Sequence, residues 1–238
     1  MRAITNIGTV QVSARDVDDA ARRLESVAIM TALEQSPRLT EEVGVAVYLK
    51  REDIQVCRSF KVRGAYNKIA ALSKDEAQPG VAAASAGNHA QGVAYACAQL
   101  GIKGKIFLPS NTPRQKRNRI ATIGKGWVEQ IIVDGSFDKA NEEADRVARE
   151  EGLCFVPPYD DPMTIAGQGT IAVELDQQIP EGTDSVVIPM GGGGLAAGIA
   201  VYLKEKRPNV KVIGVDPDGA ASIKAAMQAG HPVTLDKV

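Results

Sequence analysis

Four consecutive glycines, Gly191 to Gly194, form the most conspicuous candidate for chemistry in this sequence. They follow the apolar run SVVIPM at 185–190 and precede the helical pattern LAAGIAVYLKEK. Residues without a Cβ let backbone N–H groups converge on an oxyanion, and the N-terminus of the following helix adds partial positive charge. The pattern predicts a phosphate-binding loop, although glycines also serve the close packing of a helix on a strand.

The glycine loop alone does not identify the phosphate compound. GGGGLA matches the relaxed dinucleotide fingerprint G-x-G-x-x-G/A, and Asp216, at the end of the next expected strand, would accept the ribose hydroxyls of NAD. No Gly-Lys-Ser/Thr follows the loop, which disfavours ATP or GTP. From this motif, an NAD-dependent dehydrogenase is an open alternative.

The second candidate is Lys61, in the segment RSFKVRGAYNKIAAL at 58–72. The Ser-Phe-Lys triplet opens a helical pattern and places Lys61 in its first turn, where a positive charge opposes the helix dipole. If the amine is buried beside Phe60, desolvation shifts it towards the neutral form that nucleophilic lysines require. A solvated lysine on a basic segment also fits, and the spacing alone favours that interpretation.

The third candidate is the turn Ser85-Ala86-Gly87-Asn88-His89, between the small-residue strand VAAA and a helical pattern. Turns at the carboxyl ends of strands are where α/β sheets bind ligands. This turn offers a hydroxyl, an amide and several backbone N–H groups, which suit a carboxylate or a phenolic oxygen. An Asn/Ser helix cap with a packed or solvated histidine is an equally good interpretation of this motif by itself.

Short β-type runs alternate with longer helical patterns, which predicts parallel sheets built from βαβ units. The clearest helix is 135–152, where Ser136 can cap the start and Gly152 can end it. Asp161-Pro162 marks another helix start, a capping side chain followed by proline at the first helical position. The expected strands are 45–49, 80–84, 105–108, 127–133, 153–156, 185–190 and 210–215.

The composition excludes several classes of function. Of 238 residues, 28 are basic and 29 acidic, and this net charge of −1 gives no electrostatic case for nucleic acid or an anionic membrane. The uncharged run 186–203 is interrupted by Pro189 and glycines, so we expect no membrane span. Cys57, Cys97 and Cys154 are widely spaced and only two histidines are present. We therefore predict no metal site, reduced thiols and a cytoplasmic location.

Three motifs together resemble one family. SFKVRGA, SAGNHAQG and GGGGLAAG, in this order and spacing, resemble the pyridoxal-phosphate enzymes of the tryptophan-synthase-β fold type, and specifically their threonine dehydratase (threonine ammonia-lyase) branch. KREDIQ (50–55), FVPPYDDPMTIAGQGT (155–170) and AGHPVTL (229–235) extend the resemblance over nearly the whole chain. It implies an α/β fold with two parallel-rich αβα domains. The small domain would comprise residues 56–159, and the large domain residues 1–55 and 160–238.

Carried over residue by residue, the resemblance implies pyridoxal 5'-phosphate as the cofactor. Lys61 would bind it covalently and act as the catalytic base, Phe60 would flank it, and Asn88 would hydrogen-bond its ring oxygen. The cofactor phosphate would be held by Gly191, Gly192, Gly193, Gly194 and Leu195. The substrate carboxylate would be received by Ser85, Ala86, Gly87, Asn88 and His89.

The reaction implied by the resemblance is the deamination of L-threonine, and of L-serine, to 2-oxobutanoate or pyruvate and ammonia, in isoleucine biosynthesis. Serine racemases that resemble this family carry a serine at the position of Ala86, used to protonate the opposite face of the carbanion. Alanine has no proton to give, so elimination is expected here. The resemblance also implies a small amino-acid substrate and a homo-oligomer, a dimer or a tetramer.

The sequence departs from the family pattern in two places. Thr31-Ala32-Leu33 stands where the family usually has Thr-Pro-Leu, which removes no chemistry. The sequence also ends at Val238, before the rest of the large domain and before the family's partner for the pyridine nitrogen. The large domain is therefore expected to be incomplete, with uncovered apolar surface. A catalytically incompetent fragment that binds the cofactor is an alternative from a different class.

Overall fold

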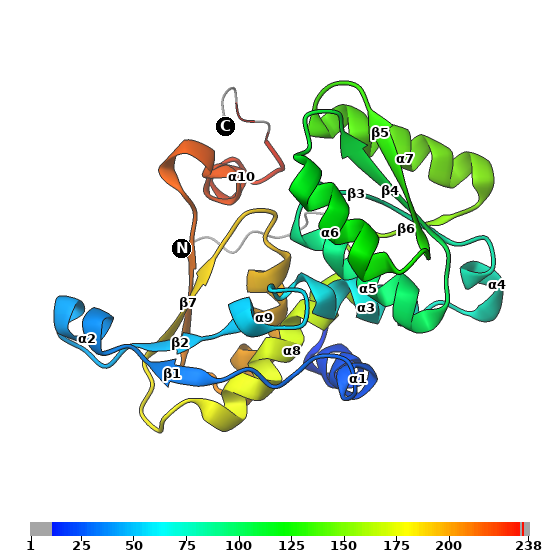
Figure 1. Ribbon diagram of the computed structural model, residues 1–238. Helices are drawn as coiled ribbons and strands as arrows, with labels where there is room; N and C mark the ends of the chain where they lie inside the picture. Colours follow the sequence, from blue (N-terminus) through cyan, green and yellow to red (C-terminus); the bar gives the residue numbers. More distant parts are fainter. Residues whose placement is uncertain (1–10, 234, 236–238) are drawn as a thin grey trace.

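The computed structural model describes residues 11–233 and 235. Residues 1–10, 234 and 236–238 belong to the predicted large domain, and residue 234 also to the motif at 229–235; they lie outside the described residues. Figure 1 shows a sheet with its helices on one side of the molecule, and a second group of strands and helices on the other.

The first layered unit is a four-stranded parallel sheet with strand order β5-β4-β3-β6. Three long helices flank it, and each follows one strand of the sheet, as the alternating sequence pattern predicts. The strands are β3 (Val81–Ala84), β4 (Gly104–Pro109), β5 (Val128–Val133) and β6 (Cys154–Phe155), and the helices are α5 (Asn88–Leu100), α6 (Arg114–Gly124) and α7 (Phe137–Glu151).

Side chains that alternate along β3 and β4 divide the core of this unit into two layers. Val81 and Ala83 of β3 pack with α5 and α6, whereas Ala82 and Ala84 pack with α7. All four residues are fully buried. Both faces of β3 are therefore covered, which explains why its sequence is uniformly apolar and small.

The second unit contains a two-stranded parallel sheet of β7 (Ser185–Pro189) and β8 (Lys211–Val215). Ile188 of β7 joins a core with apolar residues of α1 (Ala14–Leu24), α8 (Pro162–Gln178) and α9 (Gly194–Lys206). On the same two strands, Val187, Ile213 and Val215 are exposed. Apolar side chains therefore remain uncovered in this unit.

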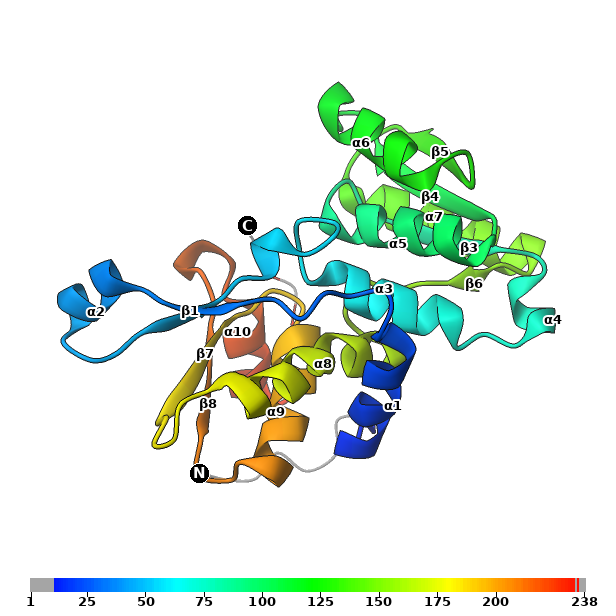
Figure 2. The ribbon, with the colours of Figure 1, turned by 60° about the horizontal axis from the view of Figure 1, so that its bottom comes forward.

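Helix α3 (Lys61–Ala70) connects the two units, because it packs against α5 on one side and against α8 on the other. A Cβ at Gly92 of α5 would lie 3.0 Å from the carbonyl oxygen of Lys61, and a Cβ at Gly167 of α8 would lie 2.6 Å from Cα of Gly64. These glycines let the helix backbones approach closely. Figure 2 shows α3 between α5 and α8.

The remaining elements are short. Figures 1 and 2 show an arm that extends from the body of the molecule. The arm consists of two antiparallel strands, with one helix between them in the sequence. The arm comprises β1 (Leu33–Gln35), α2 (Pro37–Val43) and β2 (Tyr48–Lys50). The others are a 3-10 turn (Glu52–Ile54), α4 (Lys74–Ala77), a second 3-10 turn (Asp218–Ala220) and α10 (Ser222–Ala229).

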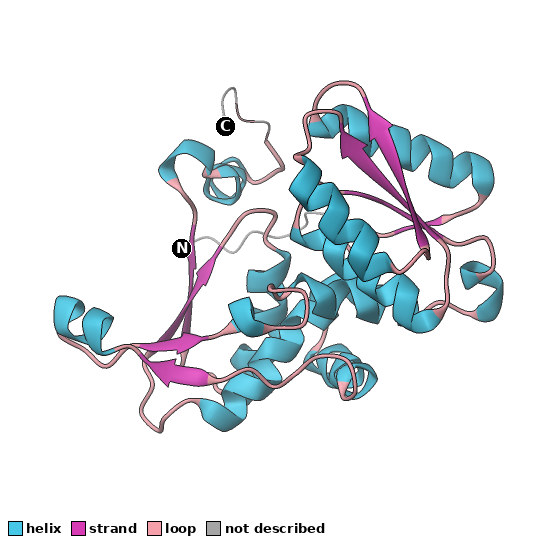
Figure 3. Ribbon diagram, in the orientation of Figure 1, coloured by secondary structure: helices cyan, strands magenta, loops and turns pink. Residues whose placement is uncertain are grey.

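The structure confirms most of the expected elements (Figure 3). Ser136 caps α7 and Gly152 ends it, and Asp161 caps α8 with Pro162 at its first position. The strand expected at 45–49 is found at 48–50, and β1 and α2 were not predicted. The larger sheet lies within 56–159 and β7 with β8 within 160–238, but the domain division itself stays a prediction. Among the described residues, no helix is long and apolar enough to cross a membrane.

Candidate active site

Lys61 is the first residue of α3, and its amine points into the protein. The Ser59 hydroxyl accepts a hydrogen bond from the Lys61 backbone N–H at 3.2 Å, which satisfies one of the free donors at the helix start. Nζ donates to the carbonyl oxygen of Pro158 at 2.6 Å, and it lies 5.4 Å from the centre of the Phe60 ring. Burial lowers the pKa of this amine to about 8. Of the two interpretations of Lys61, the structure favours the buried amine.

The turn at 85–89 lies at the carboxyl end of β3, as expected, and leads directly into α5. Gly87 is the residue before the helix, and no side chain caps it. The N–H groups of Asn88, His89 and Ala90, in the first turn, therefore have no acceptor within the helix. Asn88 is exposed. This cluster of free donors suits an anionic group such as a carboxylate.

The side chain of His89 is engaged with the Val156 carbonyl in the core. The imidazole is buried, and its Nε2 lies 2.8 Å from the carbonyl oxygen of Val156. Because a carbonyl accepts, Nε2 carries the proton and Nδ1 is a bare acceptor. Burial lowers the pKa of this histidine to about 4, so the ring is neutral. The imidazole packs as a core histidine, while the backbone N–H of His89 remains with the turn.

The four glycines form the connection between β7 and α9. Gly193 has φ +80°, a left-handed conformation that favours glycine, and Gly194 is the first helical residue. The N–H groups of Gly194, Leu195 and Ala196 have no acceptor within the helix. The side chain of Leu195 packs into the same core as Phe60. The loop thus has the two parts of a phosphate site, converging N–H groups and a helix N-terminus.

A segment outside the three main motifs, within the run 155–170 that extends the resemblance, brings the three clusters together. We call Val156 to Tyr159 the connector. The Val156 carbonyl meets the His89 ring, and the Pro158 carbonyl accepts from Lys61. A Cβ on Gly192 would lie 2.2 Å from Cγ of Tyr159. The connector therefore touches the turn, the lysine and the glycine loop in succession.

The residues present fit pyridoxal phosphate. The partly buried Lys61, whose pKa is lowered, contacts Pro158, and the next residue of the connector, Tyr159, contacts the glycine loop. An amine that can react with an aldehyde and a loop that can bind a phosphate are therefore held by adjacent residues. Among the residues that the structure describes, a Cβ on Gly191 or on Gly87 would meet nothing within 4 Å, which leaves space beside both sets of N–H donors. The residues thus offer N–H donors for a phosphate and an amine for an aldehyde.

Asp216, which was considered for the ribose of NAD, has one carboxylate oxygen bound to the backbone of α10. Its Oδ2 accepts a hydrogen bond from the backbone N–H of Lys224 in α10, at 3.0 Å. This oxygen is therefore engaged within the chain. Among the described residues, no group of three or more His, Cys, Asp or Glu side chains is placed to hold a metal ion.

The sequence analysis included the connector in the run 155–170 but gave it no role, because its residues carry no group typical of catalysis. Two consecutive prolines directly after an expected strand were the available signal, since proline fixes φ and makes such a segment rigid. That signal indicates a rigid link but does not say what the link contacts. The contacts come from chain segments far away in the sequence.

Comparison with known proteins identifies a family over most of the chain. Residues 24–238 match the family described as pyridoxal-phosphate dependent enzyme. The L-threonine dehydratase biosynthetic IlvA of Mycobacterium leprae is 50% identical over 233 residues, which cover 98% of this chain and 55% of that relative. The protein of the same name from Bacillus subtilis is 46% identical over 227 residues, covering 95% of this chain and 54% of that relative. The chain thus spans about half the length of the curated relatives it matches.

Solved structures agree in fold. The processed form of threonine deaminase isoform 2 from Solanum lycopersicum superposes with a TM-score of 0.86 at 39% identity, covering 98% of this chain and 70% of that one. Maize serine racemase superposes with a TM-score of 0.89 at 32% identity, covering 94% of this chain and 67% of that one. The expected fold class is confirmed by these similarities.

Proposed function

This chain belongs to the family of pyridoxal-phosphate dependent enzymes, and we propose that it deaminates L-threonine, and L-serine as a second substrate, to the 2-oxo acid and ammonia. The observation that carries the proposal is the Lys61 amine, held by Pro158 beside the glycine loop with its pKa lowered to about 8. The curated relatives, named biosynthetic threonine dehydratases, support threonine as the substrate and a place in isoleucine biosynthesis.

Lys61 is the proposed catalytic residue. When bound, pyridoxal phosphate supplies an electron sink for a negative charge that develops at Cα of an amino acid. A base near Cα is needed, and a neutral amine serves well when its pKa is near the working pH. Burial brings the Lys61 amine into that range, so Nζ can accept the Cα proton.

The turn at 85–89 is the proposed site for the substrate carboxylate. Its free N–H donors, at Asn88, His89 and Ala90, lie at the start of α5, where the helix dipole also favours an anion. Ala86 carries no group that can return a proton to Cα. This supports elimination of the β-hydroxyl rather than racemisation.

The loop Gly191–Gly194 is the proposed phosphate site. The N–H groups of Gly194, Leu195 and Ala196 supply the donors, and the left-handed Gly193 gives the backbone its curvature. Phe60 would flank the cofactor ring, because its own ring lies 5.4 Å from Nζ of Lys61. The exposed amide of Asn88 would reach the oxygen of the cofactor ring.

The proposal extends to assembly and location. We place the protein in the cytoplasm, supported by its three cysteines, all of which are unpaired. A homo-oligomer, a dimer or a tetramer, is supported by the apolar side chains exposed on β7 and β8, which a second copy can cover.

The test is a 2-oxo acid assay of the purified chain with L-threonine and with L-serine, each with and without pyridoxal phosphate. We expect cofactor-dependent 2-oxobutanoate from threonine and visible absorbance from the lysine-bound cofactor. Lys61→Ala should abolish the absorbance and lower the rate by about a thousandfold or more. Lys74→Ala, at an exposed lysine of α4, is the matched control and should change neither.

Two results would count against the proposal in different ways. Cofactor absorbance without any 2-oxo acid would favour the alternative of a cofactor-binding fragment without catalytic competence. An unchanged absorbance in Lys61→Ala would remove Lys61 from the site altogether.

A further inference from the structure

The connector has an unusual set of contacts for four consecutive residues. The Val156 carbonyl meets the ring of His89 at 2.8 Å, and the Pro157 carbonyl accepts from the Thr164 hydroxyl at 3.2 Å. The Pro158 carbonyl accepts from Nζ of Lys61 at 2.6 Å. Each contact reaches a different helix, so the connector is held from several sides.

Tyr159, the last residue of the connector, lies against the glycine loop. A Cβ on Gly192 would lie 2.2 Å from Cγ and 2.3 Å from Cδ1 of the Tyr159 ring. A Cβ on Gly194 would lie 2.7 Å from the Tyr159 carbonyl oxygen. Real Cβ atoms do not approach other atoms this closely, so the backbone of the loop rests directly on the ring and main chain of Tyr159.

The packing of Tyr159 explains why two of the four glycines are needed, and the reason is independent of a ligand. Gly192 and Gly194 make room for Tyr159, whereas a Cβ on Gly191 would meet nothing within 4 Å. The ring therefore supports the loop at Gly192 and Gly194, whereas the space beside Gly191 is left open by the described residues. Such a support fixes the directions of the loop's N–H donors before any ligand binds.

We propose that Tyr159 is a positioning residue that sets the conformation of Gly191–Gly194 and thereby the affinity of this loop for the phosphate group of pyridoxal phosphate. The inference rests on the proposed function, because it takes pyridoxal phosphate as the ligand. Tyr159 acts through the glycine loop. Lys61 is held by the carbonyl of the neighbouring Pro158, so a change of the Tyr159 side chain leaves that contact in place.

The sharpest test compares pyridoxal phosphate with pyridoxal, which carries the same aldehyde but no phosphate. Dissociation constants are measured by titration of the purified chain, with visible absorbance as the signal. Tyr159→Ala should weaken pyridoxal phosphate by about tenfold or more and leave pyridoxal within about twofold. Tyr159→Phe, which keeps the ring and loses only the hydroxyl, should bind both ligands like the unmodified chain.

A double-mutant cycle with Gly192→Ala tests the contact itself. In the unmodified chain, the new methyl group overlaps the Tyr159 ring, and pyridoxal phosphate should bind about tenfold more weakly. In the Tyr159→Ala background the ring is gone, so the same substitution should cost less than about threefold. Gly219→Ala, where a Cβ would meet nothing within 4 Å, is the control and should have no effect in either background.

Several outcomes would overturn the inference. Equal weakening of both ligands by Tyr159→Ala would mean a general structural role, and no weakening would mean that the ring does not support the loop. Additive effects in the cycle would also contradict the contact. If the unmodified chain binds neither ligand, the proposed function fails first, and that result differs from every pattern above.

Discussion

Two buried cations, two residues apart on α3, have opposite surroundings. Lys61 has one hydrogen-bond acceptor, the carbonyl oxygen of Pro158, and burial lowers its pKa to about 8. Arg63 is 1% exposed and lies between two carboxylates. Burial alone would lower the pKa of Arg63, but its hydrogen bonds to Glu52 and Glu174 outweigh that effect and raise it.

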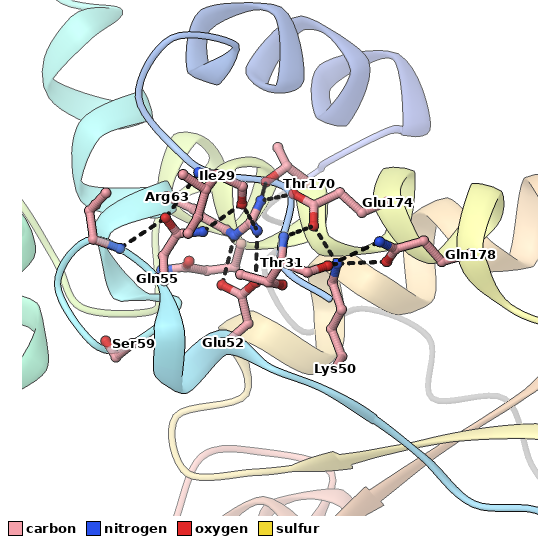
Figure 4. Close-up of polar contacts among 12 residues, drawn as sticks. Ile29, Thr31, Lys50, Glu52, Gln55, Ser59, Arg63, Thr170, Glu174 and Gln178 are labelled. Carbon is pink, nitrogen blue, oxygen red and sulfur yellow. Dashed lines mark hydrogen bonds and ion pairs between the residues drawn. The ribbon is translucent and has the colours of Figure 1, made fainter. Parts of the chain in front are cut away.

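Figure 4 shows how completely Arg63 is paired. Its Nε lies 2.9 Å from one oxygen of Glu52, and a terminal nitrogen lies 2.7 Å from the other, a bidentate arrangement. The remaining terminal nitrogen lies 2.6 Å from Glu174 and 3.1 Å from the Thr170 hydroxyl. Lys50 also pairs with Glu174, and it donates to Gln178 at 2.7 Å.

The difference between Lys61 and Arg63 shows what decides whether a cation withdrawn from water becomes a structural charge or a reactive amine. Both side chains lose contact with water, but among the described residues only Arg63 receives counter-charges that compensate for its desolvation. Lys61 has a neutral carbonyl as its partner, which compensates for burial less than a carboxylate would, so burial lowers its pKa. Arg63 links α3 to α8 through Glu174 and to the 3-10 turn before α3 through Glu52. These ion pairs hold the start of α3, where Lys61 lies.

The largest effect on stability is expected from Arg63→Met. This variant tests whether the ion pairs compensate for the burial of charge around Arg63. The substitution removes the guanidinium and leaves the Glu52 carboxylate, only partly exposed, without its cation and with the Thr31 hydroxyl as its remaining partner. We expect a loss of about 3–5 kcal/mol in the free energy of unfolding, because a charge is left without compensation. Urea unfolding of the chain at pH 7 measures it.

The double variant Arg63→Met with Glu52→Gln is the matched control for this prediction. It removes the abandoned charge as well and should recover part of the lost stability. A cost for Arg63→Met below about 1 kcal/mol would mean that the network contributes little, and the contrast with Lys61 would lose its basis.

This contrast also shows how far sequence carries the argument. The alternation of strands and helices, the caps at Ser136 and Asp161, and the helix start at Lys61 follow from local chemistry and were predicted. Whether Lys61 is solvated or buried depends on Pro158, which is distant in the sequence, so spacing alone favoured the wrong interpretation.

The strand β1, the helix α2 and the ion-pair network were missed for a similar physical reason. β1 pairs with β2 across an intervening helix, and the three residues of β1 carry too short a pattern to predict. Glu174 reaches Arg63 from the middle of α8, and an acidic residue on a helix ordinarily indicates a solvated face. The roles that the resemblance assigns to the residues of the three motifs stay predictions.

The pH dependence of the free energy of unfolding is the second test of the contrast between Lys61 and Arg63. The pKa of Lys61 is lowered in the folded chain, whereas that of Arg63 is raised. The ordinary pKa of lysine is 10.5, and in the folded chain that of Lys61 is about 8. Above pH 10.5 both states are neutral at Lys61. As the pH falls from 10.5 to 8, the unfolded chain takes up the proton and the folded chain does not, so stability falls. Below pH 8 the penalty is constant.

We therefore expect Lys61→Met to remove a pH-dependent loss of about 2 kcal/mol between pH 10.5 and 8, reduced from the full linkage value because the side chain is partly exposed. Urea unfolding of both chains without cofactor, across this pH range, measures the difference. Competitive acetylation followed by mass spectrometry gives the pKa directly, with exposed Lys74 as the internal reference. Parallel stability curves for the two chains would show that Lys61 titrates like a solvated lysine.

The smallest effect is expected from Thr170→Val, which asks whether Arg63 needs more than its carboxylates. The buried Thr170 hydroxyl accepts from Arg63 at 3.1 Å and donates to the Gly167 carbonyl at 2.7 Å. Valine keeps the shape and removes both bonds. Because Glu52 and Glu174 still hold the charge, we expect a loss of only about 1 kcal/mol.

Thr122→Val on α6 is the matched control, since its exposed hydroxyl also donates to a backbone carbonyl, that of Asn118, at 2.9 Å, but meets no cation. The difference between the two variants in urea unfolding isolates the contact with Arg63. If Thr170→Val costs as much as Arg63→Met, the hydroxyl would be indispensable to the network. Compensation of the buried Arg63 charge would then depend on the neutral hydroxyl as well as on the two carboxylates, and the contrast with Lys61 could not be assigned to counter-charge alone.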